Sequence, residues 1–160
     1  MLKGKLLDEI NRLLAQDRDR VSTARAIADA IRREGAYRWT GLYDVDIQRG
    51  VVSNIAWSGA GPPEYPTFPL TKGLTSRAIG EKKTINAGDV TNDPDYLTAL
   101  ATTRSEIIVP VLDVARNSVV GTIDVESEHS HAFDPCAQKQ LEECAVVLRA
   151  LWSNRLPTKE

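Results

Sequence analysis

Apolar residues in the first 35 positions recur every three or four residues, which is the spacing of amphipathic helices. Two such stripes predict two helices within 1–34. Asp19 is placed to cap or charge the first turn of the second helix, and Gly35 is placed to end it. The first stripe is Leu2, Leu6, Leu7, Ile10, Leu13 and Leu14, and the second is Val21, Ala24, Ile27, Ala28 and Ile31.

The pattern then changes to the alternation of β-strands. It predicts a strand over 37–46 and a return strand over 51–58, joined by a turn at 48–50. The segment 59–69 holds two Gly and four Pro, so it is expected to form a loop. Alternation places a row of residues on one face of the first strand: Tyr37, Trp39, Gly41, Tyr43 and Val45.

The second half of the chain adds shorter elements and a long final helix. A helix is predicted over 73–82, a brief strand over 84–87, and a turn at 92–95 followed by a weakly helical segment at 97–103. Pro135 suits the first position of the last helix, whose apolar face runs to Trp152. The strands joined by hairpins predict a largely antiparallel sheet with helices on its faces, an α+β domain.

The stretch 104–128 places acidic residues inside apolar strands. Two β-branched runs, 107–112 and 119–125, flank a polar turn and suggest the centre of a sheet that is covered on both faces. Glu106, Asp124 and Glu126 lie in or beside these runs, although carboxylates are rarely buried unless they are paired. Some group has to compensate their charge, which makes these acids the leading candidates for a functional site.

The face on which Glu106 lies depends on the strand register. Alternation puts Thr122, Asp124 and Glu126 on one face of their strand. A loop with an odd number of residues, such as 114–116, pairs Glu106 with Asp124 on that face, whereas an even loop, 114–117, pairs it with Val125 and moves it to the other face. We favour the odd loop.

Composition narrows the class of protein. The 160 residues are 42% hydrophobic and 26% charged, which is typical of one globular domain, predicted over 1–157, with the sheet, pocket loops and last helix within 36–155. A net charge of −2 gives no reason to expect nucleic acid, and no apolar run reaches transmembrane length, so a cytoplasmic protein without a membrane partner is expected. Cys136 and Cys144 are too far apart along one helix to be bonded, and are expected to be free thiols.

Four segments together resemble a GAF domain, and within that family the free methionine-R-sulfoxide reductases. They are YRWTGLY at 37–43, FPLTKGLTSRAIGEKKTINAGDV at 68–90, TRSEIIVPV at 103–111 and VVGTIDVESEHSHAFD at 119–134. The resemblance implies a six-stranded antiparallel sheet, N- and C-terminal helices packed together, and a small-molecule pocket on one sheet face beneath the loops of 59–103. It also implies a homodimer formed through the first and last helices.

The resemblance also assigns residues to that pocket. It implies that two aromatic residues line the pocket and that three acids bind an ammonium group of the ligand; here these are Trp39, Tyr43, Glu106, Asp124 and Glu126. Elementary chemistry points the same way. Clustered carboxylates raise one another's pKa, so an empty pocket should hold a proton, and an ammonium group with three donors would relieve the repulsion. An aromatic face would add a cation–π attraction of roughly 0.5–2 kcal/mol.

The chain differs from the reductases in the positions of its cysteines. The resemblance places their cysteines at the segments that read Gly73-Leu74-Thr75-Ser76 and 96–100 here, and neither segment has a cysteine. Hydroxyl groups at Thr75, Ser76 or Thr98 cannot perform thiol–disulfide exchange, although they are candidates for polar contacts with a ligand. We therefore expect a non-catalytic sensor that binds an amine or an amino-acid-like ligand and needs no cofactor.

Several alternatives remain open. The protein could be a reductase that uses a displaced thiol, in which case Cys136 or Cys144 must border the acids, or a dimerisation domain with a vestigial, filled pocket. The aromatic residues could be simple core residues, Glu126 could be exposed, and Arg77 or Arg104 could neutralise the acids. His129 and His131 are expected to be loop residues rather than metal ligands. The chain lacks the Cys-His pair of bilin-binding GAF domains, a cyclic-nucleotide signature, a suitably placed haem histidine and a P-loop.

Overall fold

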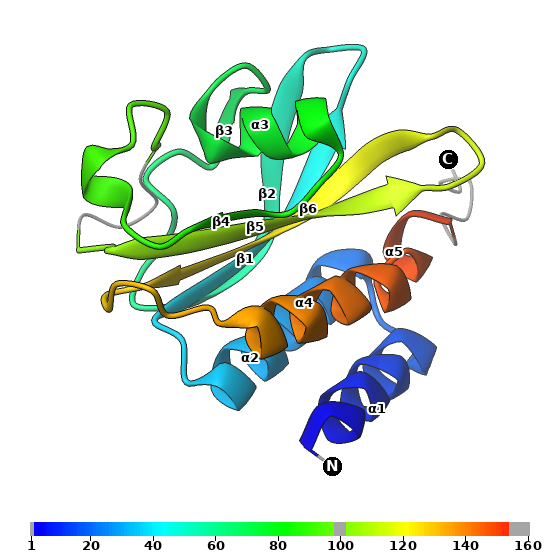
Figure 1. Cartoon of the computed structure of the whole chain (residues 1–160). Coiled ribbons are helices and arrows are strands. Elements are labelled where there is room, and N and C mark those ends of the chain that lie inside the picture. The colour runs from blue at the N-terminus through cyan, green and yellow to red at the C-terminus, as the bar shows by residue number, and fades with distance from the viewer. Residues whose placement is uncertain (1, 98–101, 154–160) are drawn as a thin grey trace.

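The computed structural model describes residues 2–97 and 102–153 and contains one sheet of six strands (Figure 1). The strand order is β3-β2-β1-β6-β5-β4, and every neighbouring pair is antiparallel. The hairpins β1–β2 and β5–β6 meet along β1 and β6, which places β6 in the middle of the sheet. The strands are β1 (Trp39–Asp46), β2 (Val51–Gly59), β3 (Thr67–Pro69), β4 (Ile85–Ala87), β5 (Ser105–Asp113) and β6 (Ser118–Ser127).

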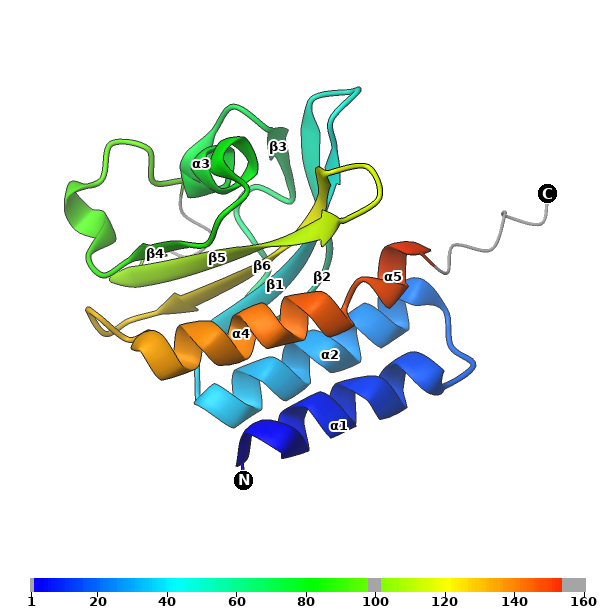
Figure 2. The same cartoon turned by 45° about the vertical axis from the view of Figure 1, so that its right-hand side comes forward.

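Helices cover one face of the sheet, and a shorter helix with the loops covers the other. Figure 2 shows α1, α2 and α4 side by side beneath the sheet, while α3 lies above it near β3. The fold is therefore α+β, and the predicted packing of the N-terminal against the C-terminal helix is confirmed by contacts between α1 and α4. The helices are α1 (Leu2–Ala15), α2 (Arg20–Gly35), α3 (Gly73–Glu81), the 3₁₀ turn η1 (Val90–Asn92), α4 (Pro135–Val147) and α5 (Ala150–Ser153).

The ends of the longer helices are set by local hydrogen bonds. The Asp19 side chain accepts from the Ser22 N–H at 2.9 Å, so this residue is the N-cap predicted from the sequence. Asp134 caps α4 in the same way, with Pro135 next to it in the first turn. Gly35 is the last residue of α2, and Ala36 takes the left-handed conformation that closes the helix, with φ 52°.

The apolar side chains form separate clusters on the two faces of the sheet. The larger cluster joins the helices to Leu42, Ile123 and Val125, which point to the helical face. Tyr37 belongs to this cluster and stacks near Phe133 at 5.2 Å, so its predicted place beside Trp39 is wrong. The reason is that β1 begins only at Trp39, and strand alternation does not extend to a residue before the strand.

The central hairpin confirms that Glu106 and Asp124 share a face, but the odd loop is wrong. Asp113 pairs with Ser118, which leaves the even loop 114–117 between the strands. With a regular ladder, that loop would have moved Glu106 to the helical face.

A β-bulge in β6 restores the register. Between two ladder pairs the chain of β6 carries one additional residue, Val120, which shifts every later pair by one position. Beyond the bulge Glu106 lies opposite Glu126, and Asp124 is two residues further along the same face. The even loop together with the bulge therefore places Glu106 on the same face as Asp124, as the odd loop favoured from the sequence would have done.

Two other predicted elements differ from the structure. The loop 59–69 contains the short edge strand β3, which pairs with β2, while the weakly helical segment at 97–103 falls largely outside the described residues. The last helix is broken after Val147 rather than continuous to Trp152. Trp152 contacts residues that are distant in the sequence: its indole N–H donates to Asp44 of β1 at 2.8 Å, and the Arg20 guanidinium lies 5.2 Å from its ring centroid.

None of the described helices is both long and apolar enough to cross a membrane.

Candidate functional site

Three carboxyl groups meet on the face of the sheet opposite the helical layer. Glu106 comes from β5, and Asp124 and Glu126 come from β6; one carboxylate oxygen of each lies within 4.8 Å of the other two. Their exposed fractions are 2%, 6% and 0%, so the predicted alternative in which Glu126 is exposed is wrong. The cross-strand pairing of Glu106 with Glu126 makes this arrangement a direct consequence of the bulged register.

No lysine or arginine among the described residues forms an ion pair with these acids. Arg77 instead pairs with Asp93 at 2.6 Å and Asp95 at 3.6 Å. Glu126 accepts hydrogen bonds from the hydroxyls of Thr103 and Tyr96. Such hydroxyls satisfy oxygen atoms without neutralising charge, so no described side chain compensates the charge that these acids carry when they are ionised.

Burial raises the pKa of all three acids. The pKa of Asp124 rises to about 6 and that of Glu126 to about 8, in both cases mainly because the groups are removed from water. The pKa of Glu106 lies well above its ordinary value because the group is buried and faces two other carboxylates. Burial also raises the pKa of the Tyr43 phenol, which stays neutral. Near neutral pH the empty cluster therefore holds protons.

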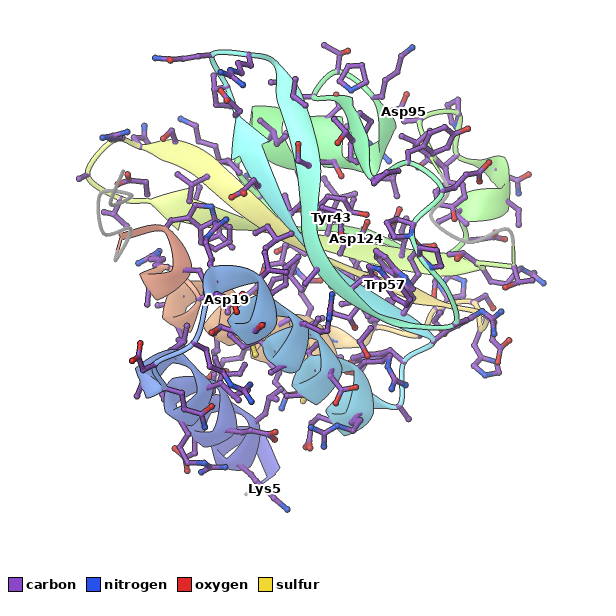
Figure 3. The ribbon with its side chains drawn as sticks, turned by 180° about the vertical axis from the view of Figure 1, so that it is seen from behind. Lys5, Asp19, Tyr43, Trp57, Asp95 and Asp124 are labelled. Atoms are coloured by element: carbon purple, nitrogen blue, oxygen red, sulfur yellow. The ribbon has the colours of Figure 1, made fainter. Side chains whose placement is uncertain are left out.

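A small cavity of about 20 Å³ lies against the acids. That volume accommodates roughly one water-sized group. Figure 3 shows Tyr43 and Asp124 side by side in the interior, and both belong to the cavity wall. The wall consists of Tyr43, Tyr65, Phe68, Gly73, Leu74, Thr75, Leu97, Glu106, Ile108 and Asp124.

The structure brings some of the predicted site residues to the cavity wall and places others outside it. Tyr43, Glu106, Asp124 and Thr75 line the cavity, whereas Glu126 belongs to the carboxyl cluster but not to the wall. Trp39 and Ser76 are not in the wall. Thr98 lies outside the described residues.

Trp39 lies behind the cavity wall, next to Tyr43. Its side chain is fully buried, its indole N–H donates to the Gly61 carbonyl at 2.9 Å, and its ring lies 6.4 Å from that of Tyr43. The W-x-G-x-Y spacing has a steric reason, because the Trp39 ring occupies the space above Gly41. This tryptophan thus fixes the loop at Gly61 and the angle of Tyr43.

The sequence did not single out four residues of the site. Tyr65 and Phe68 come from the proline-rich segment, which the sequence indicated only as loop. Tyr96 and Thr103 are the hydroxyl donors to Glu126. Thr103 is the first residue of the segment 103–111 quoted above but was not assigned to the site, and nothing in the local pattern indicates that the Tyr96 hydroxyl reaches β6.

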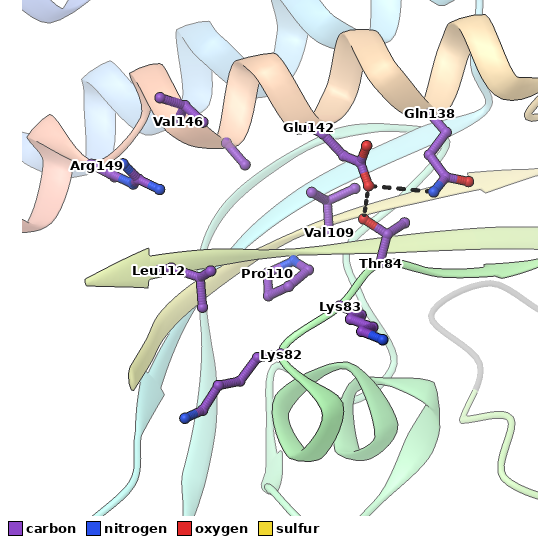
Figure 4. A pocket seen from close by; sticks show the side chains of 11 residues that line it. Lys82, Lys83, Thr84, Val109, Pro110, Leu112, Gln138, Glu142, Val146 and Arg149 are labelled. Atoms are coloured by element: carbon purple, nitrogen blue, oxygen red, sulfur yellow. Dashed lines mark hydrogen bonds between the residues drawn. The ribbon is translucent and has the colours of Figure 1, made fainter. Parts of the chain in front are cut away.

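Larger hollows lie elsewhere but lack a comparable group of buried charges. Figure 4 shows one of about 410 Å³ between α4, the open edge of β5 and the end of α3. Glu142 accepts there from Thr84 and Gln138, so this acid already has partners. Lys82, Lys83 and Arg149 border the hollow. We assign function to the smaller cavity because converging buried polar groups distinguish a ligand site better than volume does.

The two cysteines lie away from the acids. Both belong to α4, on the helical side of the sheet; Cys136 is exposed and Cys144 is buried in the helix-side cluster. Burial raises the pKa of the Cys144 thiol to about 12, which makes it a poor nucleophile.

The three carboxyl groups of Glu106, Asp124 and Glu126 could also coordinate a hard divalent cation. The described histidines do not belong to that group.

Comparisons with known proteins agree with this architecture. No protein-family model matches the chain. GAF domain-containing protein A of Dictyostelium discoideum is 24% identical over 143 residues, covering 89% of this chain and 87% of the relative. The free methionine-R-sulfoxide reductase of Neisseria meningitidis, solved with its substrate, superposes with a TM-score of 0.83 at 26% identity, covering 93% of this chain and 87% of that one.

A solved GAF domain superposes with a TM-score of 0.81 at 21% identity, covering 92% of this chain and 85% of that one, which establishes the fold alone. The Neisseria reductase has the higher sequence identity of these two solved structures. The chain therefore has a GAF-like fold, and it is similar both to GAF domain proteins and to the free methionine-R-sulfoxide reductases.

Proposed function

We propose that this protein is a non-catalytic, ligand-binding GAF domain whose pocket takes a small amine or amino-acid-like cation. The observation that carries the proposal is a set of three buried carboxyl groups without a described cationic partner, beside a cavity with aromatic walls. Buried carboxylates are costly, and a bound cation is the natural group to offset that cost.

An ammonium group fits the chemistry of this cluster. It offers three N–H donors and one positive charge, while Asp124 Oδ1 and Glu126 Oε2 have no hydrogen-bond donor among the described residues. Tyr43 and Phe68 add ring surface, with their centroids 5.8 Å apart. Binding would convert the protonated cluster into carboxylates held by charge-assisted hydrogen bonds.

The size of the cavity sets a condition on the ligand. Its volume of about 20 Å³ holds the ammonium head but not an amino-acid side chain. Tyr65 belongs to the outer wall and is already 42% exposed, so a rotation of this side chain toward solvent is the simplest way to enlarge the site. The vestigial-pocket hypothesis requires that no space remain beside Asp124, and this cavity, though small, argues against it.

A methionine-sulfoxide reductase remains the competing function because of the structural likeness. That chemistry needs a thiolate near the substrate and a second thiol to resolve the intermediate. Neither Cys136 nor Cys144 borders the described acid cluster. We therefore propose that recognition is retained and that the reaction is absent.

A thermal-shift titration tests the proposal. The panel is free methionine, its R-sulfoxide, small amino acids, simple amines, and MgCl₂ and CaCl₂. A ligand at about 100 times its dissociation constant should add roughly 2.7 kcal/mol to the free energy of unfolding. We expect a shift with at least one ammonium compound and its loss in Asp124→Asn, which removes charge without changing shape.

Asp113→Asn is the matched control, because Asp113 lies at the far end of β5 and is not in the cavity wall. It should leave the shift intact. A shift with the metal salts alone would indicate that the site binds a divalent cation rather than an amine. No shift with any compound would favour the dimerisation hypothesis.

Homodimerisation through the first and last helices stays a prediction. Much of the apolar surface of α1 and α4 packs within the chain itself, and Val21 and Val146 are the large apolar side chains that remain exposed on the described helices. We expect light scattering at micromolar concentration to give the mass of a dimer. A monomeric mass would contradict this prediction and would leave the ligand proposal unaffected.

A further inference from the structure

The outer edge of β5 is only partly covered by another strand. β4 is the last strand of the sheet, and it pairs with residues 106–108 of β5. β5 continues to Asp113, so within the described part of the chain residues 109–113 have no strand on that side. The chain before β4 turns away from this edge at Lys82, whose left-handed conformation, with φ 54°, closes α3. An open edge of this kind can pair with a further strand.

The hollow of about 410 Å³ lies along this open edge (Figure 4). Val109, Pro110 and Leu112 of β5 belong to its wall, and Ala145 and Val146 of α4 give it an apolar side. Val146 is 53% exposed, although it is a large apolar side chain on a helix that packs against the sheet. The volume falls in the range of pockets that hold ligands. The hollow therefore offers the edge of a strand together with apolar surface beside it, which are the two features that strand-shaped partners use.

The side chains around the hollow carry an excess of positive charge. Lys82 and Lys83 are exposed, and neither forms an ion pair with a described residue. Arg149 borders the hollow as well. Glu142 is the one acid in its described wall, and its carboxylate already accepts from the Thr84 hydroxyl at 2.5 Å and from Gln138 at 3.3 Å. A partner with acidic side chains is therefore complementary to this surface.

We propose that the open edge of β5 binds an extended acidic segment of a partner protein, which joins the sheet as a strand in line with β4. Side chains of an added strand alternate between the two faces of the sheet. Figure 4 shows Val146 of α4 on one side of β5 and Lys82 and Lys83 on the other. The segment therefore carries apolar side chains toward Val146 and acidic side chains toward the lysines.

A second copy of this chain is a poorer occupant of the same edge. Its β5 edge would bring Lys82 and Lys83 against the same two residues, and like charges repel. Pro110 lacks an N–H, so two such edges would also have fewer donors with which to pair. This docking surface is separate from the cavity beside Asp124, and it does not depend on the ligand proposed there.

Three fluorescein-labelled peptides test the proposal by fluorescence anisotropy. EVEVEVE has the proposed alternation of acidic and apolar side chains, EEVVVEE has the same composition without the alternation, and KVKVKVK has the alternation with the opposite charge. We expect EVEVEVE to bind about tenfold more tightly than either of the other two. Its binding should also slow hydrogen exchange of the backbone amides in 111–113, which lie on the part of β5 beyond β4.

Charge reversal locates the site. Lys82→Glu/Lys83→Glu should weaken EVEVEVE about tenfold, because it replaces the attraction by repulsion. Lys5→Glu/Lys139→Glu is the matched control: both lysines are exposed, neither belongs to the wall of the hollow, and the net charge changes by the same amount. This control should leave the affinity for EVEVEVE unchanged.

Four results would overturn the proposal. EVEVEVE might not bind at a protein concentration of about 1 mM, which is the weak limit of a specific contact. Equal affinity of EEVVVEE and EVEVEVE would show that charge alone is recognised, without a strand. Equal weakening in the two double variants would show attraction to the whole protein rather than to this edge. Unchanged hydrogen exchange in 111–113 would place the peptide elsewhere. The ligand proposal stands in each case.

Discussion

The unliganded protein is expected to become more stable as the pH falls from 8 to 5. In most proteins, buried carboxylates have partners and favour the folded state when they are ionised. Here the pKa of Asp124 rises to about 6 and that of Glu126 to about 8, and the pKa of Glu106 is raised as well. The folded protein therefore binds more protons than the unfolded chain between pH 4.5 and 8, and its free energy of unfolding decreases as the pH rises through that interval.

The expected change is large. The shift of Glu126 from an ordinary value of 4.5 to about 8 corresponds to on the order of 5 kcal/mol at 1.36 kcal/mol per pKa unit. Because the three acids titrate together and the structure can relax, we expect about 3–5 kcal/mol for the whole cluster. The pKa values of Asp19, Asp29 and Asp89 are lowered by hydrogen bonds, which has the opposite sign; their contribution to stability is present above the ordinary aspartate pKa of about 4 and is lost as the pH falls below it.

Urea unfolding at pH 5, 6, 7 and 8 measures this profile without adding salt. The variant Asp124→Asn/Glu126→Gln should give a less steep profile, because Glu106 is then the only member of the cluster that titrates, and it should be more stable than the original protein at pH 8, since it buries fewer charges. A saturating ammonium ligand should flatten the profile of the original protein in the same way. Stability that increases with pH over this interval would contradict the cluster described above.

Gly41→Ala is expected to lower the free energy of unfolding by about 2–3 kcal/mol through overpacking. A Cβ at this position would lie 2.3 Å from Cη2 and 2.7 Å from Cζ3 of Trp39, and 3.0 Å from Cε1 of Tyr43. The Trp39 ring is fully buried and its N–H is held by Gly61, so it has little freedom to move aside. The displaced rings should also weaken ligand binding in the thermal-shift assay.

Gly80→Ala is the control for this substitution. Its Cβ would meet no atom within 4 Å, and the position lies in α3, so the change should stabilise the protein by about 0.4–1 kcal/mol. Combining Gly41→Ala with Trp39→Phe should recover part of the loss, because the smaller ring leaves room for the methyl group. Equal stability of Gly41→Ala and Gly80→Ala would show that the tryptophan does not occupy this space.

Local patterns were sufficient for most of the elements. The helical stripe that includes Leu6 and Ile10 became α1, Asp19 became the N-cap of α2, and the alternating runs became the two hairpins, because these features depend on residues within one or two turns of chain. The three acids were also identified from the sequence, since charged residues inside apolar strands are conspicuous wherever the strands finally pair.

Contacts between distant parts of the chain decided the rest. The face on which Glu106 lies depends on a bulge at Val120, and Trp152, in the short helix after the break, contacts Asp44 and Arg20 from distant parts of the chain. The hydroxyl donors to Glu126 likewise come from segments that precede β5. Such contacts are absent from any window of the sequence, because their free energy arises only when the sheet has formed.

The sequence by itself determined an α+β domain related to known GAF proteins, with acids and aromatic residues in its central strands and no cysteine in the two segments of the reductase thiols. Only the tertiary structure decided that the acids meet without a described cation, that Trp39 supports the cavity rather than lining it, and that the start of α3 lines the same cavity as Glu106 and Asp124. The physical reason is that charge compensation and cavity shape depend on which atoms come within a few ångströms of one another, and in this protein those atoms belong to β1, β5, β6 and α3, which are far apart along the chain.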